Sequence, residues 1–65
     1  IDYAMNLVSI KCHSGLANAA CAGLDMMNLS YVVGTIAGDD TIMIAVRSVE
    51  DTRILMGKIR ELMKQ

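Results

Sequence analysis

The sequence predicts an α+β domain, a two-layer sandwich in which two helices lie on one face of a mainly antiparallel sheet. Three segments, 5–12, 31–36 and 41–46, show the alternation or the β-branched, apolar content of strands. Two others, 16–28 and 48–65, are rich in good helix formers or repeat apolar residues at helical spacing. The expected order is strand, helix, strand, strand, helix. With 65 residues, the chain is long enough for one small domain, 1–65.

The first strand, 5–12, alternates between two faces. Asn6 and the preceding Asp2-Tyr3 suggest a turn that enters the strand, and His13-Ser14-Gly15 breaks it. Ser14 is a candidate N-cap for the following helix. The residues expected to share one face of the strand are Val8, Ile10 and Cys12.

The first helix, 16–28, is apolar nearly all round, which predicts burial on more than one side: against the sheet and against a partner chain. Asn18 and Asp25 are the exceptions, and with Ala22 between them they lie along one stripe. An acid near a helix C-terminus opposes the macrodipole. Asp25 is either a residue at a solvated edge or part of a site.

The turn between the next two strands carries the most unusual residues of the chain. In the segment 37–40, Gly38 is free to adopt a positive φ, so a tight hairpin is expected. Turn chemistry accounts for one aspartate, but less readily for Asp39 and Asp40 together. The strand 42–46 that follows has no polar residue on either face, as expected of a central strand covered on both sides.

The last helix opens as a capping box, with Ser48 as N-cap and Asp51 three residues on. Acidic residues begin this helix and the basic residues Lys58, Arg60 and Lys64 come later, in accord with the macrodipole. An apolar stripe faces the sheet and comprises Leu55, Met56, Ile59, Leu62 and Met63.

Composition points to self-association. Hydrophobic residues make up 54% of the chain and the mean hydropathy is +0.42, which is more apolar surface than so small a domain can bury by itself. A homo-oligomer is therefore expected. The net charge of −1 gives no basic footprint for nucleic acid, and no run reaches the ~20 apolar residues of a membrane span.

Two cysteines, Cys12 and Cys21, do not form a disulfide framework, so reduced thiols of a cytoplasmic protein are expected. Because the chain begins at Ile1 rather than at Met, we expect a fragment of a longer protein.

Catalysis has little support in this sequence, and an enzyme acting on a small cationic substrate is the weakest of the hypotheses. His13 stands without a nucleophile or acid at motif spacing, and Cys21 lies in an apolar helix without activating charges. Asp39 and Asp40 lack the spaced oxygen ligands of a divalent metal site, so no metal is expected. Together with Asp25 they suit an organic cation, because carboxylates pair with guanidinium through parallel hydrogen bonds. If the acids meet between subunits, such a cation couples binding to assembly.

The segment 34–41 resembles the G-T-I-A-G-D-D-T signature of the C-terminal domain of bacterial arginine repressors. Gly15-x-Ala17-Asn18-Ala19 resembles the P-G-x-A-Q-A segment of that family, Leu24-Asp25 its apolar-Asp pair, and 48–65 its final helix. The resemblance covers essentially the whole chain.

The resemblance implies a regulatory domain that forms trimers, two of which pair into a hexamer with L-arginine between them as corepressor. It also implies a separate winged helix-turn-helix domain, absent from this chain, that binds operator DNA and controls arginine metabolism. The residues that it would place at the arginine site are Asp39, Asp40, Asp25, Asn18, Ala17, Ala19, Thr35 and Ala37.

Two positions depart from the family pattern: Ser14 replaces the usual Pro, and Asn18 the usual Gln, which is one methylene longer. Asn18 is therefore expected to bind more weakly or through a bridging water. The alternative to an arginine sensor is a structural trimerisation module that no longer responds to ligand.

Overall fold

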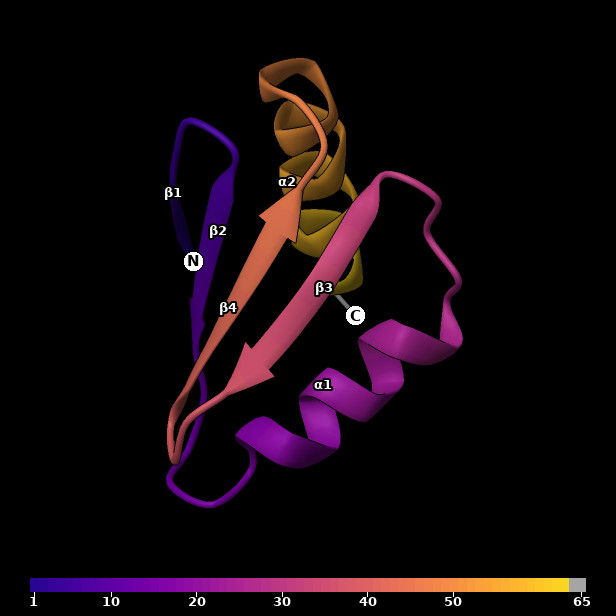
Figure 1. Cartoon of the computed structure of the whole chain (residues 1–65). Coiled ribbons are helices and arrows are strands. Elements are labelled where there is room, and N and C mark those ends of the chain that lie inside the picture. Colours follow the sequence, from indigo (N-terminus) through magenta and orange to yellow (C-terminus); the bar gives the residue numbers. More distant parts are fainter. Residues whose placement is uncertain (64–65) are drawn as a thin grey trace.

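The computed structural model describes residues 1–63, with side chains to residue 61. It has four strands and two helices (Figure 1). In chain order these are β1 (Asp2–Ala4), β2 (Leu7–Lys11), α1 (Ala17–Met26), β3 (Val32–Ala37), β4 (Thr41–Val46) and α2 (Val49–Met63).

The four strands form one antiparallel sheet in the order β1-β2-β4-β3. The predicted α+β class and the central position of β4 are confirmed. In the register, Ile44 of β4 lies between Val8 of β2 and Thr35 of β3. A bulge in β3 lies between Val32 and Gly34.

The sequence-based prediction missed β1. Asp2-Tyr3 is not a turn but part of a short edge strand, whereas Asn6 does lie in a turn, at Met5-Asn6. Three residues are too few to show an alternating pattern. Met5 also has φ 55°, a left-handed conformation that is uncommon for methionine and that its residue type does not predict. Asn6 fixes the end of this hairpin through its carbonyl, which accepts from the Val46 N–H at 2.9 Å.

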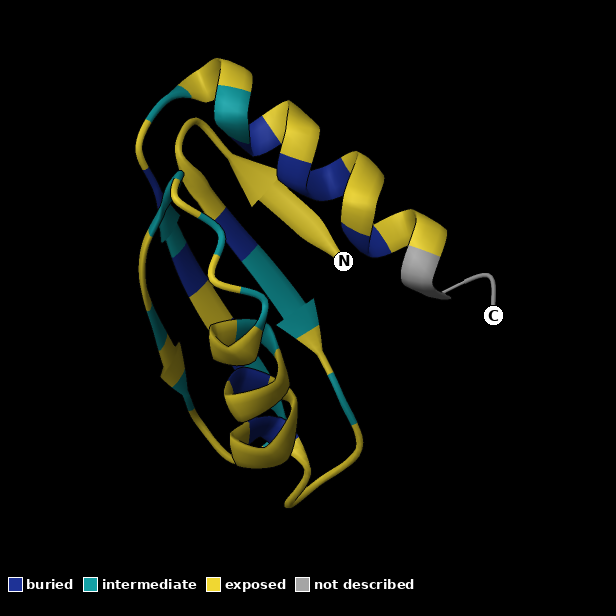
Figure 2. Ribbon diagram, turned by 90° about the vertical axis from the view of Figure 1, so that its right-hand side faces the viewer, coloured by how far each residue is buried: buried dark blue, intermediate teal, exposed yellow. Residues whose placement is uncertain are grey.

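The core lies on one face of the sheet. Alternate residues of β4, Ile42, Ile44 and Val46, are buried there together with Val8. Both helices pack on this face, so the predicted two-layer arrangement is confirmed (Figure 2). The helices contribute the buried residues Ala17, Cys21, Leu55, Met56 and Ile59.

The opposite face of the sheet carries no layer within the described chain. Met43, Leu7 and Ile36 of three neighbouring strands are exposed there, Ile36 to 74%. The expectation that β4 is covered on both sides is therefore wrong for a single subunit. The apolar second face of β4 is therefore available for contact with a partner outside the subunit.

The helix α1 is shorter than expected and begins differently. It spans Ala17–Met26 rather than 16–28, and Leu16 holds the N-cap position without a side-chain cap. Ser14 is thus not the N-cap, because its hydroxyl donates to the Asp39 carboxylate instead. Asn28, with φ 50°, ends the segment beyond the helix.

The helix α2 begins with the predicted capping box. The Asp51 N–H donates to Ser48 Oγ at 3.1 Å, and the Ser48 hydroxyl donates to Asp51 Oδ2 at 2.9 Å. Leu55, Met56 and Ile59 of the predicted apolar stripe are buried. The side chains of Leu62 and Met63, and Lys64 as a whole, lie outside the described residues.

Candidate functional site: an acidic turn on the loop that precedes α1

The Gly38-Asp39-Asp40 turn connects β3 to β4, as the sequence predicts. The Gly38 N–H donates to the Thr41 carbonyl at 2.8 Å and closes the hairpin. Gly38 does not use a positive φ, so that part of the prediction is wrong. A Cβ at this position would lie 3.5 Å from the Thr41 carbonyl oxygen, which is ordinary contact. The turn therefore does not require the backbone freedom of a glycine at position 38.

The acidic turn is fixed by the loop that joins β2 to α1, which it meets at one end of the molecule (Figure 1). The Cys12 N–H donates to the Asp40 carbonyl at 2.6 Å, and the Gly15 N–H donates to the Asp39 carbonyl at 2.9 Å. Gly15 has φ 83°, a conformation that glycine adopts readily. Both aspartates thus have their backbones anchored on a second segment.

Each of the two turn carboxylates also has a hydroxyl partner. The Ser14 hydroxyl donates to Asp39 Oδ2 at 2.9 Å, and the Thr41 hydroxyl donates to Asp40 Oδ1 at 2.9 Å. Lys11 Nζ lies 3.9 Å from Asp40 Oδ2, with 78% of the lysine side chain exposed. At that distance and exposure the ion pair is weak and open to competition by another cation.

Asp25 lies at the far end of α1 and is held against β3. The Thr35 hydroxyl donates to Asp25 Oδ1 at 3.3 Å, a long hydrogen bond. Thr35 precedes Gly38 by three residues, roughly 10 Å of strand. Asp25 therefore lies beside β3, away from the turn, and does not touch it.

The remaining expected site residues divide into exposed and buried positions. Asn18, Ala19 and Ala22 are exposed, so the stripe from Asn18 to Asp25 is open to solvent along α1. Ala17 is fully buried in the core, which leaves only its backbone to meet a ligand. Ala37 is half-buried at the end of β3.

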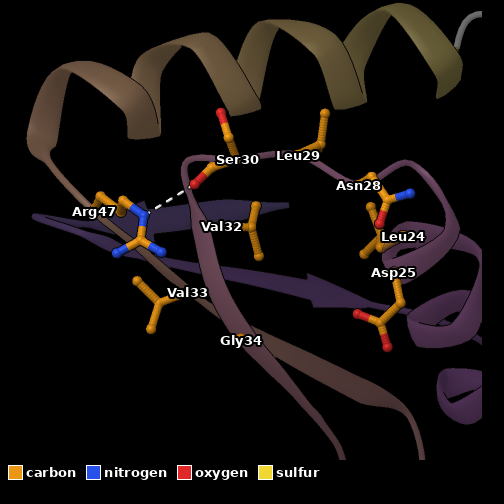
Figure 3. A pocket seen from close by; sticks show the side chains of 9 residues that line it. All are labelled: Leu24, Asp25, Asn28, Leu29, Ser30, Val32, Val33, Gly34 and Arg47. Atoms are coloured by element: carbon orange, nitrogen blue, oxygen red, sulfur yellow. Dashed lines mark hydrogen bonds between the residues drawn. The ribbon is translucent and has the colours of Figure 1, made fainter.

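A depression of about 360 Å³ lies beside Asp25, between the C-terminal end of α1 and the start of β3 (Figure 3). Neither Asp39 nor Asp40 lines this depression. Arg47 lines the other side, and its Nε donates to the Ser30 carbonyl at 2.9 Å. Arg47 and Lys11 received no role in the site from the sequence, because no motif marks a lone basic residue. Ser14 was noted only as a candidate N-cap and as a departure from the family pattern.

The three aspartates do not converge on one point within a subunit. Across the described part of the chain, no three His, Cys, Asp or Glu side chains are grouped closely enough to hold a metal ion. In the same residues, no helix has the length and apolar content needed to cross a membrane. A ligand that contacts all three acids needs an extended shape or donors from a second subunit.

Comparison with known proteins decides the family. The model of the arginine repressor C-terminal domain matches residues 1–61. The chain belongs to the arginine repressor C-terminal domain family. It is 50% identical over 64 residues to the arginine repressor of Lachnospira eligens, and 48% identical over 64 residues to that of Alkaliphilus oremlandii. It is 47% identical over 62 residues to the arginine repressor of Lachnoclostridium phytofermentans.

These matches cover 98%, 98% and 95% of this chain but only 42%, 43% and 41% of the three relatives, in the order given. The chain thus spans about two fifths of the length of the curated relatives that it matches. A repressor regulates transcription and is not an enzyme. Family membership therefore confirms the expectation that this domain is not catalytic.

Proposed function

We propose that this chain is the arginine-sensing and oligomerisation domain of a transcriptional regulator of arginine metabolism. The observation that carries the proposal is the family match over residues 1–61. The acidic turn supports it, because Asp39 and Asp40 project from a backbone that a second loop anchors. L-arginine is the effector in this proposal, and no further cofactor is required.

The proposed chemistry is recognition of a cation by carboxylates. Asp39 and Asp40 bind the guanidinium or the α-ammonium group, one of them reaching across from a facing subunit. Asp25 joins them from α1, Asn18 and Ala19 line the pocket, and Ala17 contributes backbone. Thr35 and Ala37 complete the lining from β3. Carboxylates of two facing subunits repel each other, and arginine between them removes that repulsion.

The proposed assembly is a trimer that pairs into a hexamer around the ligand. Two uncovered apolar surfaces support self-association: the open sheet face with Met43 and Ile36, and the exposed small residues of α1, Ala19, Ala22 and Gly23. The full protein is proposed to act in the cytoplasm and to bind operator DNA through a separate domain.

The test is to measure melting temperature and sedimentation of the purified protein with and without L-arginine. Asp39→Asn and Asp40→Asn are each expected to abolish both the rise in melting temperature and the shift from trimer to hexamer. Glu61→Gln, which removes an exposed acid on α2, is the charge-matched control and is expected to keep both responses. A wild type without any arginine response contradicts the proposal.

The alternative is a structural trimerisation module that ignores arginine. One observation favours it: Asp40 already lies near Lys11, and both turn carboxylates already accept from hydroxyls. Because these carboxylates already have partners within the subunit, a bound cation would contribute less binding free energy. The alternative predicts the same assembly with an unchanged melting temperature at saturating arginine.

A further inference from the structure

We infer that Ser14 positions the Asp39 carboxylate for ligand binding. The inference rests on the proposed arginine site. It assigns a role to a side chain that lies outside the expected set of ligand contacts. The evidence is the 2.9 Å hydrogen bond from the Ser14 hydroxyl to Asp39 Oδ2.

Asp39 needs such a partner more than the other two aspartates do. Asp39 is exposed at the tip of the turn, where a side chain without a partner samples several rotamers. The Gly15 N–H fixes the Asp39 carbonyl, but this bond fixes only the backbone. Ser14 is the neighbour of Gly15, so a single loop holds both the backbone and the carboxylate of Asp39.

The other acids are held differently. Asp40 is half-buried and lies between the Thr41 hydroxyl and Lys11, and Asp25 accepts from Thr35. None of these contacts involves Ser14. Among the described residues, Ser14 provides the only side-chain hydrogen bond to Asp39, so of the three acids only Asp39 loses a direct contact when the Ser14 hydroxyl is removed.

The geometry also leaves one oxygen available. The Ser14 hydroxyl bonds Oδ2, and within the described chain Oδ1 of Asp39 has no hydrogen-bond partner. A carboxylate that is oriented before the ligand arrives does not have to be ordered during binding. Loss of one such orienting bond is expected to weaken arginine binding by about three- to tenfold.

Calorimetric titration of L-arginine into wild type, Ser14→Ala, Ser14→Thr and Ser30→Ala tests the inference. Ser14→Ala is expected to bind about three- to tenfold more weakly. Ser14→Thr keeps the hydroxyl and is expected to restore affinity. Ser30→Ala removes an exposed loop hydroxyl with no side-chain hydrogen bond in the described structure and is expected to bind as wild type.

A second measurement separates positioning from a merely structural role. The Hα–Hβ couplings of Asp39 in the ligand-free protein are expected to report one rotamer in wild type and Ser14→Thr, and averaged rotamers in Ser14→Ala. The ligand-free melting temperatures of all three are expected to lie close together, because this hydrogen bond joins two exposed residues and contributes little to the stability of the fold. Averaged couplings in the wild type, or a melting temperature that falls together with the affinity, overturns the inference.

The outcomes keep this inference apart from the proposed function. Equal arginine affinity of Ser14→Ala and wild type overturns the role of Ser14 and leaves the arginine site standing. A wild type that binds no arginine overturns the proposed function, and the inference with it.

Discussion

Replacing Asp25 by Asn is expected to raise the stability of the ligand-free protein and to weaken its response to arginine. Asp25 lies in the last turn of α1, where its negative charge faces the negative end of the helix macrodipole. Removing an exposed charge of this kind stabilises by about 0.3–1 kcal/mol at low salt. Asn retains an oxygen to accept from Thr35, so the contact with β3 is preserved. The melting temperature is expected to rise by roughly 1–8 °C.

The arginine response of the same variant is expected to fall. In the wild type, ligand at 100 times its Kd stabilises by about 2.7 kcal/mol. If one charge-assisted hydrogen bond of about 2 kcal/mol is lost, the Kd rises roughly 30-fold. At the same arginine concentration, the stabilisation then drops to about 0.9 kcal/mol. Thermal unfolding at fixed protomer concentration, with and without arginine, measures both effects.

Glu50→Gln is the matched control, since Glu50 lies in the first turn of α2, where its charge is favourable. The loss of this charge is expected to lower the melting temperature and to leave the arginine response unchanged. If Asp25→Asn melts below the wild type without ligand, the helix-end argument is refuted. If it keeps the full arginine response, Asp25 is not a ligand contact.

Three further predictions concern stability and assembly. Ser48→Ala removes the cap that accepts from the Asp51 N–H and is expected to lower stability by about 1 kcal/mol in thermal unfolding, with arginine affinity unchanged. Met5→Gly relieves a left-handed backbone at φ 55° and is expected to raise the melting temperature, whereas an unchanged or lower value contradicts strain at this turn. Met43→Glu places a charge on the open sheet face, next to Ile36. It is expected to shift sedimentation toward monomer without unfolding the subunit, and intact trimers would contradict the use of this face.

The fold was largely predictable because its strongest signals are local. Periodicity or residue composition predicted both helices and three of the four strands, and the Ser48 capping box predicted the start of α2. The strand β1 was not predictable, since its three residues are too few to show alternation. Asn6 signalled the turn that follows β1, but the positive φ falls on Met5, a residue type that rarely adopts it. The role of Ser14 was misassigned because hydroxyls cap helices often, whereas a partner 25 residues away leaves no local pattern.

Only those residues of the candidate site whose type is unusual for their place in the sequence could be predicted. Asp39 and Asp40 stand out in an apolar sequence, and Asp25 stands out at a helix end that disfavours acids. The contacts that hold them come from Ser14, Lys11 and other residues whose types are common everywhere on protein surfaces. Their positions follow from how the β2–α1 loop meets the turn, which is a property of the tertiary structure.

The distribution of charge and apolar surface indicates why the proposed cation site would be incomplete in one subunit. Each of the three carboxylates is held by one hydroxyl but retains solvent exposure, and the three do not converge on a single point. A solvated carboxylate binds a cation weakly, because water screens the attraction. Docking of a second subunit over the turn would remove that water and strengthen every charge-assisted bond to the ligand. Without a cation, the same docking would desolvate the acids at a cost, so occupancy of the site and association of subunits are expected to rise and fall together.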